Sequence, residues 1–366
     1  MKIVVKIGSN IVAGPEGLDE KQINRIASEI SEVFSKGEEL VVVSSGAIAA
    51  GMKRLSLKKR PSDIRHKQAT AAVGQSALMW AYEQAFSKFQ IGVAQVLLTR
   101  DAFFDRLRYI NAKNTLLTLL DYRVIPIINE NDTVSVEEIK FGDNDLLASL
   151  VAGLLGADHL VILSDVDGLY DKDPRKHSNA RLIKTVKEIT PELKSLAGGA
   201  GSLVGTGGMY SKVLAAEKAT GFGIKVSIIN GRKRGLLKEL LLEGKDAGTT
   251  FLPAKKRLTA RKGWIAFGSR AKGEIVIDDG AVKALKTMGK SLLPSGIVNV
   301  NGQFNAGDAV YCVDERGNRI AKGLTNYSSS EVERIKGLRT SEIEKTLGYK
   351  YADEVIHRDN LVLVGA

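Results

Sequence analysis

Two lysines lie beside glycines, where phosphate chemistry is possible. Lys6 interrupts an aliphatic run, residues 2–7, that ends at Gly8, and Lys212 follows the most glycine-rich stretch of the chain, residues 198–208. Glycine lets backbone N–H groups approach an anion closely, and an ammonium group neutralises its charge. The pattern predicts a phosphate-binding site. Taken alone, each segment also fits a simpler interpretation, an ordinary first strand with a snorkelling lysine and a flexible surface loop.

The glycine-rich stretch is not one of the two common nucleotide-binding motifs. The Walker A spacing is absent, and no strand directly precedes these glycines, as the dinucleotide fingerprint requires. A helix is expected after Gly208, and its N-terminal end would add a favourable dipole to the glycine cradle. Lys212 would then lie near the first helical turn, beside the phosphates.

Polar side chains gather where four other apolar runs begin or end. Residues 44–47, 129–132 and 164–165 each follow an expected strand, and residues 142–145 precede an apolar helix. A helix start needs one capping residue, so the additional polar side chains predict a wall that hydrogen-bonds a polar ligand. For residues 44–47, simple punctuation between a strand and a helix is an equally good interpretation.

The sequence offers no histidine in these polar clusters. An alcohol acceptor usually needs a base, whereas a carboxylate is already ionised at neutral pH. Phosphoryl transfer to a carboxylate fits this composition, although an Asp can also serve as a base. Because carboxylates repel phosphates, a bridging Mg²⁺ is expected with the nucleotide, held by phosphate oxygens and water. The histidines are His66, His159, His177 and His357.

Alternating strand and helix patterns must position these groups. From residue 1 to about 245 they predict one open, mostly parallel sheet with helices on both faces. Ligands of such sheets bind at the carboxyl ends of the strands, where Lys6 and the polar clusters fall. Strands are expected over residues 2–7, 40–43, 92–98, 124–128, 160–163 and 224–230, and helices over 23–34, 65–89, 110–120, 146–155 and 209–220.

A change of composition after residue 245 predicts a second domain. At 366 residues the chain is long for a single core. A basic segment that contains Gly and Pro is followed by short β-like runs separated by glycines. We expect a catalytic domain at 1–248, a linker at 249–260 and a small, mainly β domain at 261–366.

Composition excludes several classes of protein. The single cysteine, Cys312, excludes an intramolecular disulfide and a Cys-based zinc site. We expect a cytoplasmic protein, because the sequence shows no signal peptide and no apolar run that approaches the ~20 residues of a membrane span. The formal net charge is +11, but residues from Thr259 onward carry 16 Lys and Arg against 13 Asp and Glu. The excess therefore follows the first domain and favours an anionic substrate there over RNA on the second.

Five short segments occur along the chain in the order 4–9 (VVKIGS), 45–51 (SGAIAAG), 128–132 (INEND), 142–145 (GDND) and 205–212 (GTGGMYSK). These segments, in this order, resemble the glutamate 5-kinase family, whose members have the amino acid kinase fold. Residues 291–296, 348–349 and 355–359 resemble the PUA domain that many bacterial members carry, so the resemblance covers nearly the whole chain. Ser44 and Ser164 stand where threonine is common, and both keep the hydroxyl.

The resemblance implies ATP-dependent phosphorylation of the γ-carboxylate of L-glutamate, the first step of proline biosynthesis. By matching positions, Lys6 and Lys212 would stabilise the transition state, and Asp145 would orient both lysines. The residues implied for glutamate binding are Ser45, Gly46, Asn129, Asp132, Asp143 and Asn144. Those implied for ATP binding are Lys6, Gly8, Ser164, Asp165, Thr206, Gly207, Gly208, Met209, Tyr210, Ser211 and Lys212.

The resemblance also implies Mg²⁺ bound with ATP rather than by side chains, feedback inhibition by proline, and a homo-oligomer, either dimer or tetramer. Alternatives are a kinase of N-acetylglutamate, carbamate or a nucleoside monophosphate, and RNA binding by the PUA-like domain in addition. The acidic, amide-rich acceptor segments suit the ammonium group of an amino acid better than a nucleotide. Each version requires Lys6 and Lys212 to converge in one site.

Overall fold

The chain divides into two compact units, Met1–Arg257 and Leu258–Ala366, and each has its own hydrophobic core. All of the candidate site residues belong to the first unit. The structure is a computed structural model that describes residues 1–366 except 15–16, 135–143, 175, 199–207, 255–259 and 365–366.

Eight strands of the first unit form one sheet in the order β5-β6-β4-β1-β7-β9-β10-β8. The strands from β5 to β9 pair in parallel, whereas β10 runs antiparallel to β9. The central position of β1 places its carboxyl end between those of β4 and β7. The strands are β1 Lys2–Ile7, β4 Glu39–Ser44, β5 Val93–Leu98, β6 Ile125–Glu130, β7 His159–Ser164, β8 Thr185–Val186, β9 Lys225–Asn230 and β10 Thr249–Phe251.

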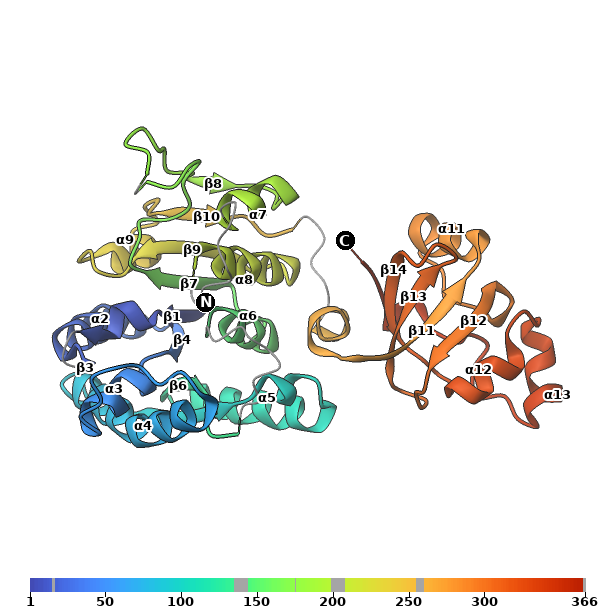
Figure 1. The fold of residues 1–366 in the computed structure, drawn as a ribbon, viewed down its shortest axis with the longest axis horizontal. Helices are drawn as coiled ribbons and strands as arrows, with labels where there is room; N and C mark the ends of the chain where they lie inside the picture. Colours follow the sequence, from blue (N-terminus) through green and yellow to red (C-terminus); the bar gives the residue numbers. More distant parts are fainter. Residues whose placement is uncertain (15–16, 135–143, 175, 199–207, 255–259, 365–366) are drawn as a thin grey trace. The chain divides into compact units, whose positions relative to one another are not determined.

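Helices cover both faces of this sheet (Figure 1). One layer contains α2, α3, α4 and α9, and the layer on the other face contains α5, α6, α7 and α8. The open, mostly parallel sheet between helices that the sequence predicts is confirmed. The helices are α1 Ser9–Val12, α2 Glu20–Phe34, α3 Ala47–Arg54, α4 Ile64–Ser87, α5 Arg106–Asp121, α6 Asn144–Leu155, α7 Pro191–Gly198, α8 Met209–Gly221 and α9 Leu236–Leu242, and a hairpin is formed by β2 Ala13–Gly14 and β3 Gly17–Leu18.

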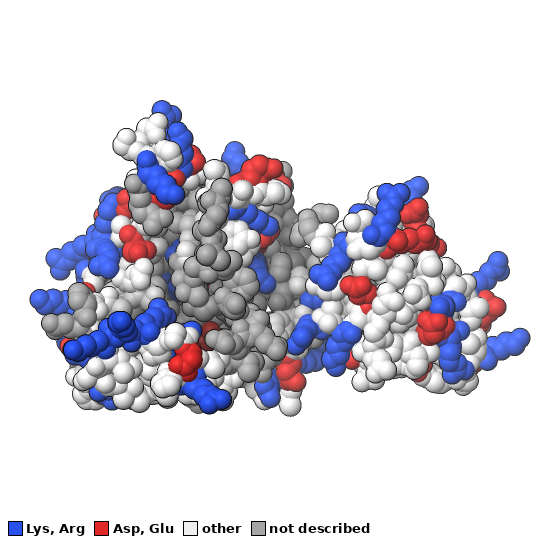
Figure 2. Space-filling model, viewed as in Figure 1, with Lys and Arg blue, Asp and Glu red and all other residues white. Residues whose placement is uncertain are grey.

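The second unit is built on a five-stranded sheet in the order β12-β11-β13-β14-β15. Its adjacent strands are antiparallel, except that β11 and β13 pair in parallel. On the face seen in Figure 2, Lys and Arg side chains of this unit are interspersed with Asp and Glu. Its main elements are α10 Ala260–Gly263, β11 Ala271–Ile277, α11 Asp279–Met288, β12 Ile297–Gly302, β13 Ala309–Asp314, β14 Arg319–Leu324, α12 Ser329–Ile335, α13 Ile343–Leu347 and β15 Leu361–Leu363.

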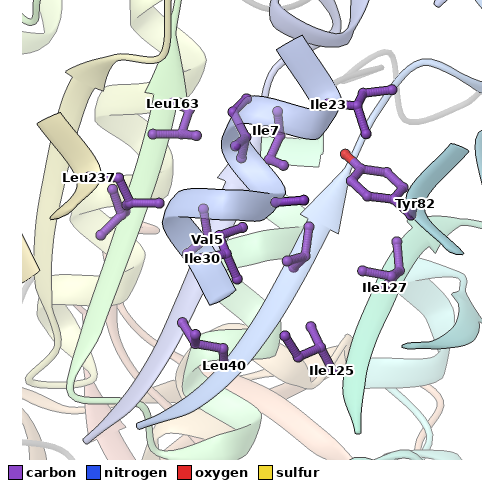
Figure 3. Packing of buried hydrophobic residues seen from close by; sticks show 14 of the residues in the cluster. Val5, Ile7, Ile23, Ile30, Leu40, Tyr82, Ile125, Ile127, Leu163 and Leu237 are labelled. Carbon is purple, nitrogen blue, oxygen red and sulfur yellow. The ribbon is translucent and has the colours of Figure 1, made fainter. Parts of the chain in front are cut away.

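Apolar side chains of the central strands pack against α2, α4 and α9 to form the main core of the first unit (Figure 3). Val5 and Ile7 of β1 belong to this core. Because side chains alternate along a strand, Lys6 points to the opposite face, where α6 and α8 lie. Full burial of one large aliphatic side chain stabilises a fold by about 1.5–3 kcal/mol. The burial of Val5 and Ile7 therefore fixes the backbone of β1 that carries Lys6.

Two glycines let α3 and α4 pack closely. A Cβ at Gly51 would lie 1.8 Å from the carbonyl oxygen of Thr70, and one at Gly74 would lie 1.8 Å from that of Ala47. Only hydrogen fits at either position without moving a backbone. The contact holds the inner face of α4 against the start of α3, next to the polar residues that follow β4.

Several element boundaries differ by a few residues from those expected, and two of the differences bear on the site and on the expected linker. Helix α6 begins at Asn144 rather than at residue 146, so Asn144 and Asp145 lie in its first turn. The segment expected as a linker begins with β10, whose threonines Thr249 and Thr250 are buried. Residues 249–251 therefore belong to the sheet. Three residues are too few to show the alternation or apolar run that marks a strand in a sequence.

Candidate active site

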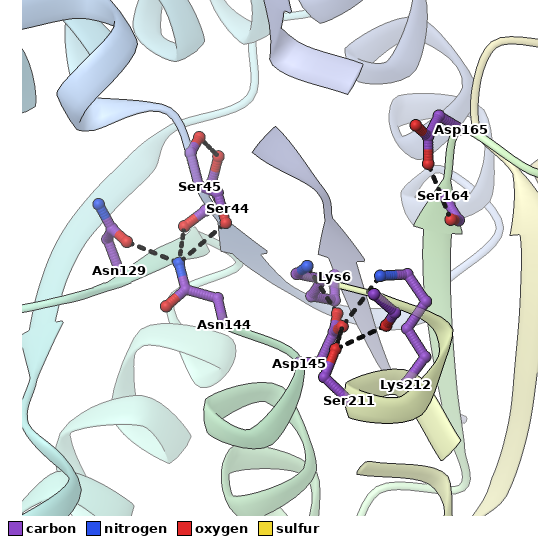
Figure 4. Close-up of polar contacts among 11 residues, drawn as sticks. Lys6, Ser44, Ser45, Asn129, Asn144, Asp145, Ser164, Asp165, Ser211 and Lys212 are labelled. Carbon is purple, nitrogen blue, oxygen red and sulfur yellow. Dashed lines mark hydrogen bonds and ion pairs between the residues drawn. The ribbon is translucent and has the colours of Figure 1, made fainter. Parts of the chain in front are cut away.

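Lys6 and Lys212 converge on one carboxylate, that of Asp145 (Figure 4). Lys6 Nζ lies 2.6 Å from Asp145 Oδ1, and Lys212 Nζ lies 3.1 Å from Asp145 Oδ2. All three residues are buried, with exposed fractions of 1% for Lys6, 5% for Lys212 and 0% for Asp145. The expectation that the two lysines share one site is confirmed.

Three elements carry these groups to the same place. Lys6 lies near the carboxyl end of β1, Asp145 in the first turn of α6, and Lys212 in the first turn of α8. Helix α6 packs against both β1 and α8. A carboxylate is favourable at a helix N-terminus because of the helix dipole. Two ammonium groups thus gather at one carboxylate, an arrangement that suits a bound anion.

Ser211 links the start of α8 to the same carboxylate. Its Oγ lies 3.0 Å from Asp145 Oδ2 and 2.8 Å from the carbonyl oxygen of Gly208. Gly208 is the N-cap residue of α8. The N-terminal end of this helix, where backbone N–H groups and the dipole favour an anion, therefore lies beside both lysines.

The remaining residues of the expected glycine-rich nucleotide segment divide into two groups. Met209 and Tyr210 occupy the first turn of α8, and Tyr210 is exposed. Thr206 and Gly207 lie outside the described residues, as does Asp143, which was expected near glutamate.

Asn144 anchors a second cluster at the carboxyl ends of β4 and β6 (Figure 4). Its Nδ2 lies 2.5 Å from the carbonyl oxygen of Ser44, 3.2 Å from Ser45 Oγ and 2.8 Å from Asn129 Oδ1. Asn144 directly precedes Asp145, so the first turn of α6 serves both clusters. The structure thus brings together Ser45, Asn129 and Asn144, three of the residues expected to bind glutamate.

Gly46 shapes the backbone beside Ser45. Its φ of +116° lies in the region that favours glycine, and a Cβ there would lie 2.8 Å from Val12 Cγ2. Gly46 is also the N-cap residue of α3. Its role is therefore to turn the chain from β4 into α3 without a side chain in the way.

Two residues of α4 support the Asn144 cluster and were not expected from the sequence. Tyr82 Oη lies 2.7 Å from Ser44 Oγ, and Gln75 Oε1 accepts a hydrogen bond from Asn129 Nδ2 at 2.8 Å. Burial raises the pKa of Tyr82 while its bond to Ser44 opposes the shift, so the phenol stays protonated. Their signal in the sequence is weak, because polar-tipped side chains on the inner face of a helix commonly serve packing alone.

Asp132 lies in the turn after β6 and is partly buried. Burial raises its pKa to about 6; the nearby Glu130 raises it too, and the charge of Arg60 opposes the shift. Asp132 is therefore ionised at pH 7 but loses its charge in mild acid. A cation bound beside it would favour the ionised form.

Ser164 and Asp165 lie at the carboxyl end of β7, near the lysines but not in contact with Asp145 among the described side chains (Figure 4). Asn10 Nδ2 donates to Asp165 Oδ2 at 2.9 Å, and Ser164 Oγ lies 3.4 Å from Asp165 Oδ1. Burial raises the pKa of Asp165, but the Asn10 bond, its own backbone N–H and the charge of Lys212 outweigh burial and lower it overall. Asn10 is a further site residue that sequence reasoning left without a role.

Gly8 keeps the turn after β1 close to β7. Its N–H donates to the carbonyl oxygen of Leu163 at 3.2 Å. A Cβ at Gly8 would lie 3.2 Å from that oxygen and 3.9 Å from Lys6 Nζ. A side chain there would crowd both the strand pairing and the space beside the Lys6 ammonium group.

Among the residues that the structure describes, no group of three or more His, Cys, Asp and Glu side chains is placed to hold a metal ion. His159 begins β7, at the strand end opposite Ser164, and its ring lies 3.0 Å from Ser227 Oγ. Burial, with the charge of Lys225, lowers the pKa of His159 to about 4, so it is a neutral, packed residue.

No helix in the described part of the chain combines the length and the apolar character needed to cross a membrane.

Comparisons with known proteins agree over the whole chain. The model of the amino acid kinase family matches residues 1–230, and that of the PUA domain matches residues 273–347. The glutamate 5-kinase of Thermoanaerobacter sp. (strain X514) is 51% identical over 365 residues, which is 100% of this chain and 98% of that protein. The glutamate 5-kinase of Geobacter sulfurreducens is 52% identical over 364 residues, 99% of this chain and 97% of that protein.

A third relative, the glutamate 5-kinase of Syntrophotalea carbinolica, is 51% identical over 362 residues, 99% of this chain and 97% of that protein. A solved structure of isopentenyl phosphate kinase superposes with a TM-score of 0.48 at 19% identity, over 69% of this chain and 100% of that chain. The family match and the full-length relatives together establish that the chain belongs to the amino acid kinase family, with a C-terminal PUA domain.

Proposed function

We propose that this kinase transfers the γ-phosphoryl group of ATP to the γ-carboxylate of L-glutamate, the first step of proline biosynthesis. The observation that supports the proposal most is the convergence of Lys6 and Lys212 on Asp145. This cationic cluster lies beside an amide-rich cluster on one side and the carboxyl end of β7 on the other (Figure 4). The full-length relatives, all glutamate 5-kinases, support the same substrate pair.

The chemical step needs charge neutralisation more than proton transfer. A γ-carboxylate oxygen attacks the γ-phosphorus, a new O–P bond forms, and the bond to the bridging oxygen breaks to release ADP. Negative charge spreads over the transferred group and the leaving phosphate. Lys6 and Lys212 are placed to neutralise that charge, and Asp145 holds both ammonium groups in position. The acceptor has no proton to lose, so no histidine is required.

The two substrates would occupy opposite sides of the lysines. On the acceptor side, Asp132 would pair with the ammonium group of glutamate, and Ser45 and Asn144 would hydrogen-bond the substrate. On the nucleotide side, Ser164 and the start of α8 would contact ATP. N-acetylglutamate lacks the ammonium group that Asp132 would select, and a nucleoside monophosphate would need more cationic side chains on the acceptor side.

Mg²⁺ would enter with ATP, held mainly by phosphate oxygens and water. The donor set fits this arrangement, because the buried carboxylate of Asp145 already faces two lysines. When bound, Mg²⁺ would supply positive charge that neutralises part of the charge on the phosphates. Asp165, which follows β7 on the expected nucleotide side, would orient water on the ion.

The proposed reaction is tested by an ADP-release assay with glutamate, N-acetylglutamate, aspartate, carbamate and UMP as acceptors. Only glutamate should support rapid release. Because an acyl phosphate reacts with hydroxylamine, the same mixture should accumulate a hydroxamate in step with ADP. Release of ADP without hydroxamate, or a faster reaction with another acceptor, would contradict the proposal.

A homo-oligomer, inhibition by proline and a cytoplasmic location complete the proposal. The edge strand β5 is partly exposed, and the nearby α4 and α5 expose Trp80, Leu107 and Ile110, a surface that suits a second copy. Proline has the ammonium and α-carboxylate groups of glutamate but no γ-carboxylate, so it would compete without reacting. Light scattering and proline titration test these points. RNA binding is not proposed, because basic and acidic side chains intermingle on the second unit (Figure 2).

A further inference from the structure

Gln75 carries a buried hydrogen-bond donor that has no acceptor among the described residues. Its Oε1 accepts from Asn129 Nδ2 at 2.8 Å. Its Nε2 is buried, and within the described part of the chain no group accepts a hydrogen bond from it. Buried donors are nearly always paired, because an unpaired one costs its desolvation free energy. Neither the sequence pattern nor the chemistry described above gives this amide group a role.

The orientation of the Gln75 amide is fixed by backbone groups. The backbone N–H of Glu130 donates to Asn129 Oδ1 at 2.9 Å, and a backbone N–H can only donate. Asn129 must therefore present its oxygen on that side and its Nδ2 to Gln75. Gln75 must in turn present Oε1 to Asn129, which leaves Nε2 as the buried donor of the pair.

A second anchor fixes the same order of donors and acceptors. Asn144 Nδ2 lies 2.5 Å from the carbonyl oxygen of Ser44, which can only accept, and it also donates to Asn129 Oδ1 at 2.8 Å. The amide chain from Asn144 through Asn129 to Gln75 thus has one polarity. It cannot be reversed by exchanging N and O in any one amide.

The partner of Nε2 must be a hydrogen-bond acceptor, because an N–H group can only donate. Nε2 is bonded to the same carbon as Oε1, so Nε2 lies close to the contact between Oε1 and Asn129. An ammonium group cannot accept a hydrogen bond, whereas a carboxylate accepts strongly. The acidic residues Asp132 and Glu130 would repel a carboxylate, so a substrate that brings one needs a donor at this wall.

We propose that Gln75 Nε2 donates a hydrogen bond to the α-carboxylate of the amino-acid substrate and so makes Gln75 a specificity-determining residue. The inference rests on the proposed function. In that function the γ-carboxylate lies at Lys6 and Lys212, where the phosphoryl group arrives, so the α-carboxylate is the anionic group left to pair. Asp132 would recognise the ammonium group and Gln75 the carboxylate of the same amino-acid head.

The test compares two substrates in two enzymes. L-Isoglutamine keeps the ammonium group and γ-carboxylate of glutamate but replaces the α-carboxylate with a neutral carboxamide. Gln75→Met, close in size and without a donor, should lower kcat/KM for glutamate about 10- to 100-fold, the range for a hydrogen bond to a charged group. It should lower kcat/KM for isoglutamine no more than about threefold and leave the KM for ATP unchanged, because a hydrogen bond to a neutral amide is weaker.

Gln75→Glu is a second variant of the same shape that puts an oxygen where Nε2 lies. It should lower kcat/KM for glutamate further by repulsion, while isoglutamine, whose carboxamide can donate, becomes the better of the two substrates. Ser87→Ala is the matched control, because Ser87 is exposed on the same helix and its hydroxyl bonds only to the Gln84 carbonyl oxygen among the described groups. It should leave both substrates unaffected.

Several outcomes would overturn the inference. If Gln75→Met lowers kcat/KM equally for both substrates, or for neither of them, Gln75 supports the fold alone. If that variant does not fold, Gln75→Glu decides by its substrate preference, and an unchanged preference for glutamate overturns the proposal. Calorimetric titration of both ligands gives the same comparison without turnover. A wild-type enzyme that neither binds nor phosphorylates glutamate would refute the proposed function itself, a result that is distinct because it needs no variant.

Discussion

Lys6 and Lys212 lie far apart in the sequence, but each contacts a different oxygen of the Asp145 carboxylate. The protein itself thus holds both charges at one point, as charge stabilisation of a transition state requires. Changes at Lys212 and at Asp145 have distinct expected effects.

Lys212→Met should lower kcat about 10²- to 10³-fold, the usual effect of removing one preorganised charge or donor. The KM for glutamate should change little, because Lys212 is proposed to act on the transferred phosphoryl group. Steady-state kinetics with each substrate varied in turn provides the measurement. Lys238→Met is the control, since Lys238 is half-exposed on α9 and forms a surface ion pair with Glu32. An unchanged kcat in Lys212→Met would remove Lys212 from the chemical step.

Asp145→Asn should destabilise the fold by about 3–5 kcal/mol, because it removes the carboxylate that both buried ammonium groups contact. The free energy of unfolding in urea, measured without substrates, gives the size of this loss. The double variant Asp145→Asn with Lys212→Met should lose less than the sum of the two single changes, by about 0.5–3 kcal/mol, because both single changes disrupt the same contact.

Strict additivity in this cycle would show that the Lys212–Asp145 contact contributes nothing to stability. Asp308→Asn is a useful comparison in the same experiment. Asp308 pairs with the exposed Lys272 of the second unit at 2.9 Å, and ion pairs at the surface contribute about 0–1 kcal/mol. The contrast between the two aspartates separates the effect of burial from that of charge pairing.

The strands could be predicted from the sequence because they are buried on both faces. The runs at Val41 and Val161, for example, lie in continuous aliphatic segments bounded by polar residues, a strong local signal. The ends of these runs also locate the site, since a parallel sheet collects its carboxyl ends at one edge. Lys6, Asp145 and Lys212 were identified through this logic together with family resemblance.

The contacts of α4 could not be predicted in the same way. Tyr82 reaches Ser44, and Gln75 reaches Asn129, from a helix that packs closely against α3 at Gly51 and Gly74. The sequence shows each residue but not the register between two helices. The short strand β10 was missed for a related reason, because pairing with β9 rather than its own pattern makes it a strand.

Removal of the second unit should leave an active kinase. A chain that ends at Arg257 keeps the complete sheet and every described site residue, and the second unit buries its own separate core. Its kcat should stay within about threefold of the full-length value, and it should unfold in one cooperative transition. A soluble, folded truncation without activity would show that the PUA domain contributes to catalysis.

Asp132 should make glutamate binding depend on pH in mild acid. Burial and Glu130 raise its pKa to about 6, and only the ionised carboxylate pairs with an ammonium group. Between pH 8 and pH 5 the ionised fraction falls about tenfold, so the KM for glutamate should rise by about the same factor. Kinetics across this range with saturating ATP tests the prediction, and the KM for ATP should follow a different profile.

Asp132→Asn provides the control, because the amide cannot titrate. Its KM for glutamate should be high and nearly independent of pH over the same range. The folded-state pKa of Asp132 lies above its ordinary value, so its ionised form destabilises the fold relative to the protonated one. Asp132→Asn should therefore gain thermal stability over the wild type above pH 6, and the gain should vanish as the pH falls toward 4. A wild-type KM that stays constant to pH 5 would place the ammonium group elsewhere.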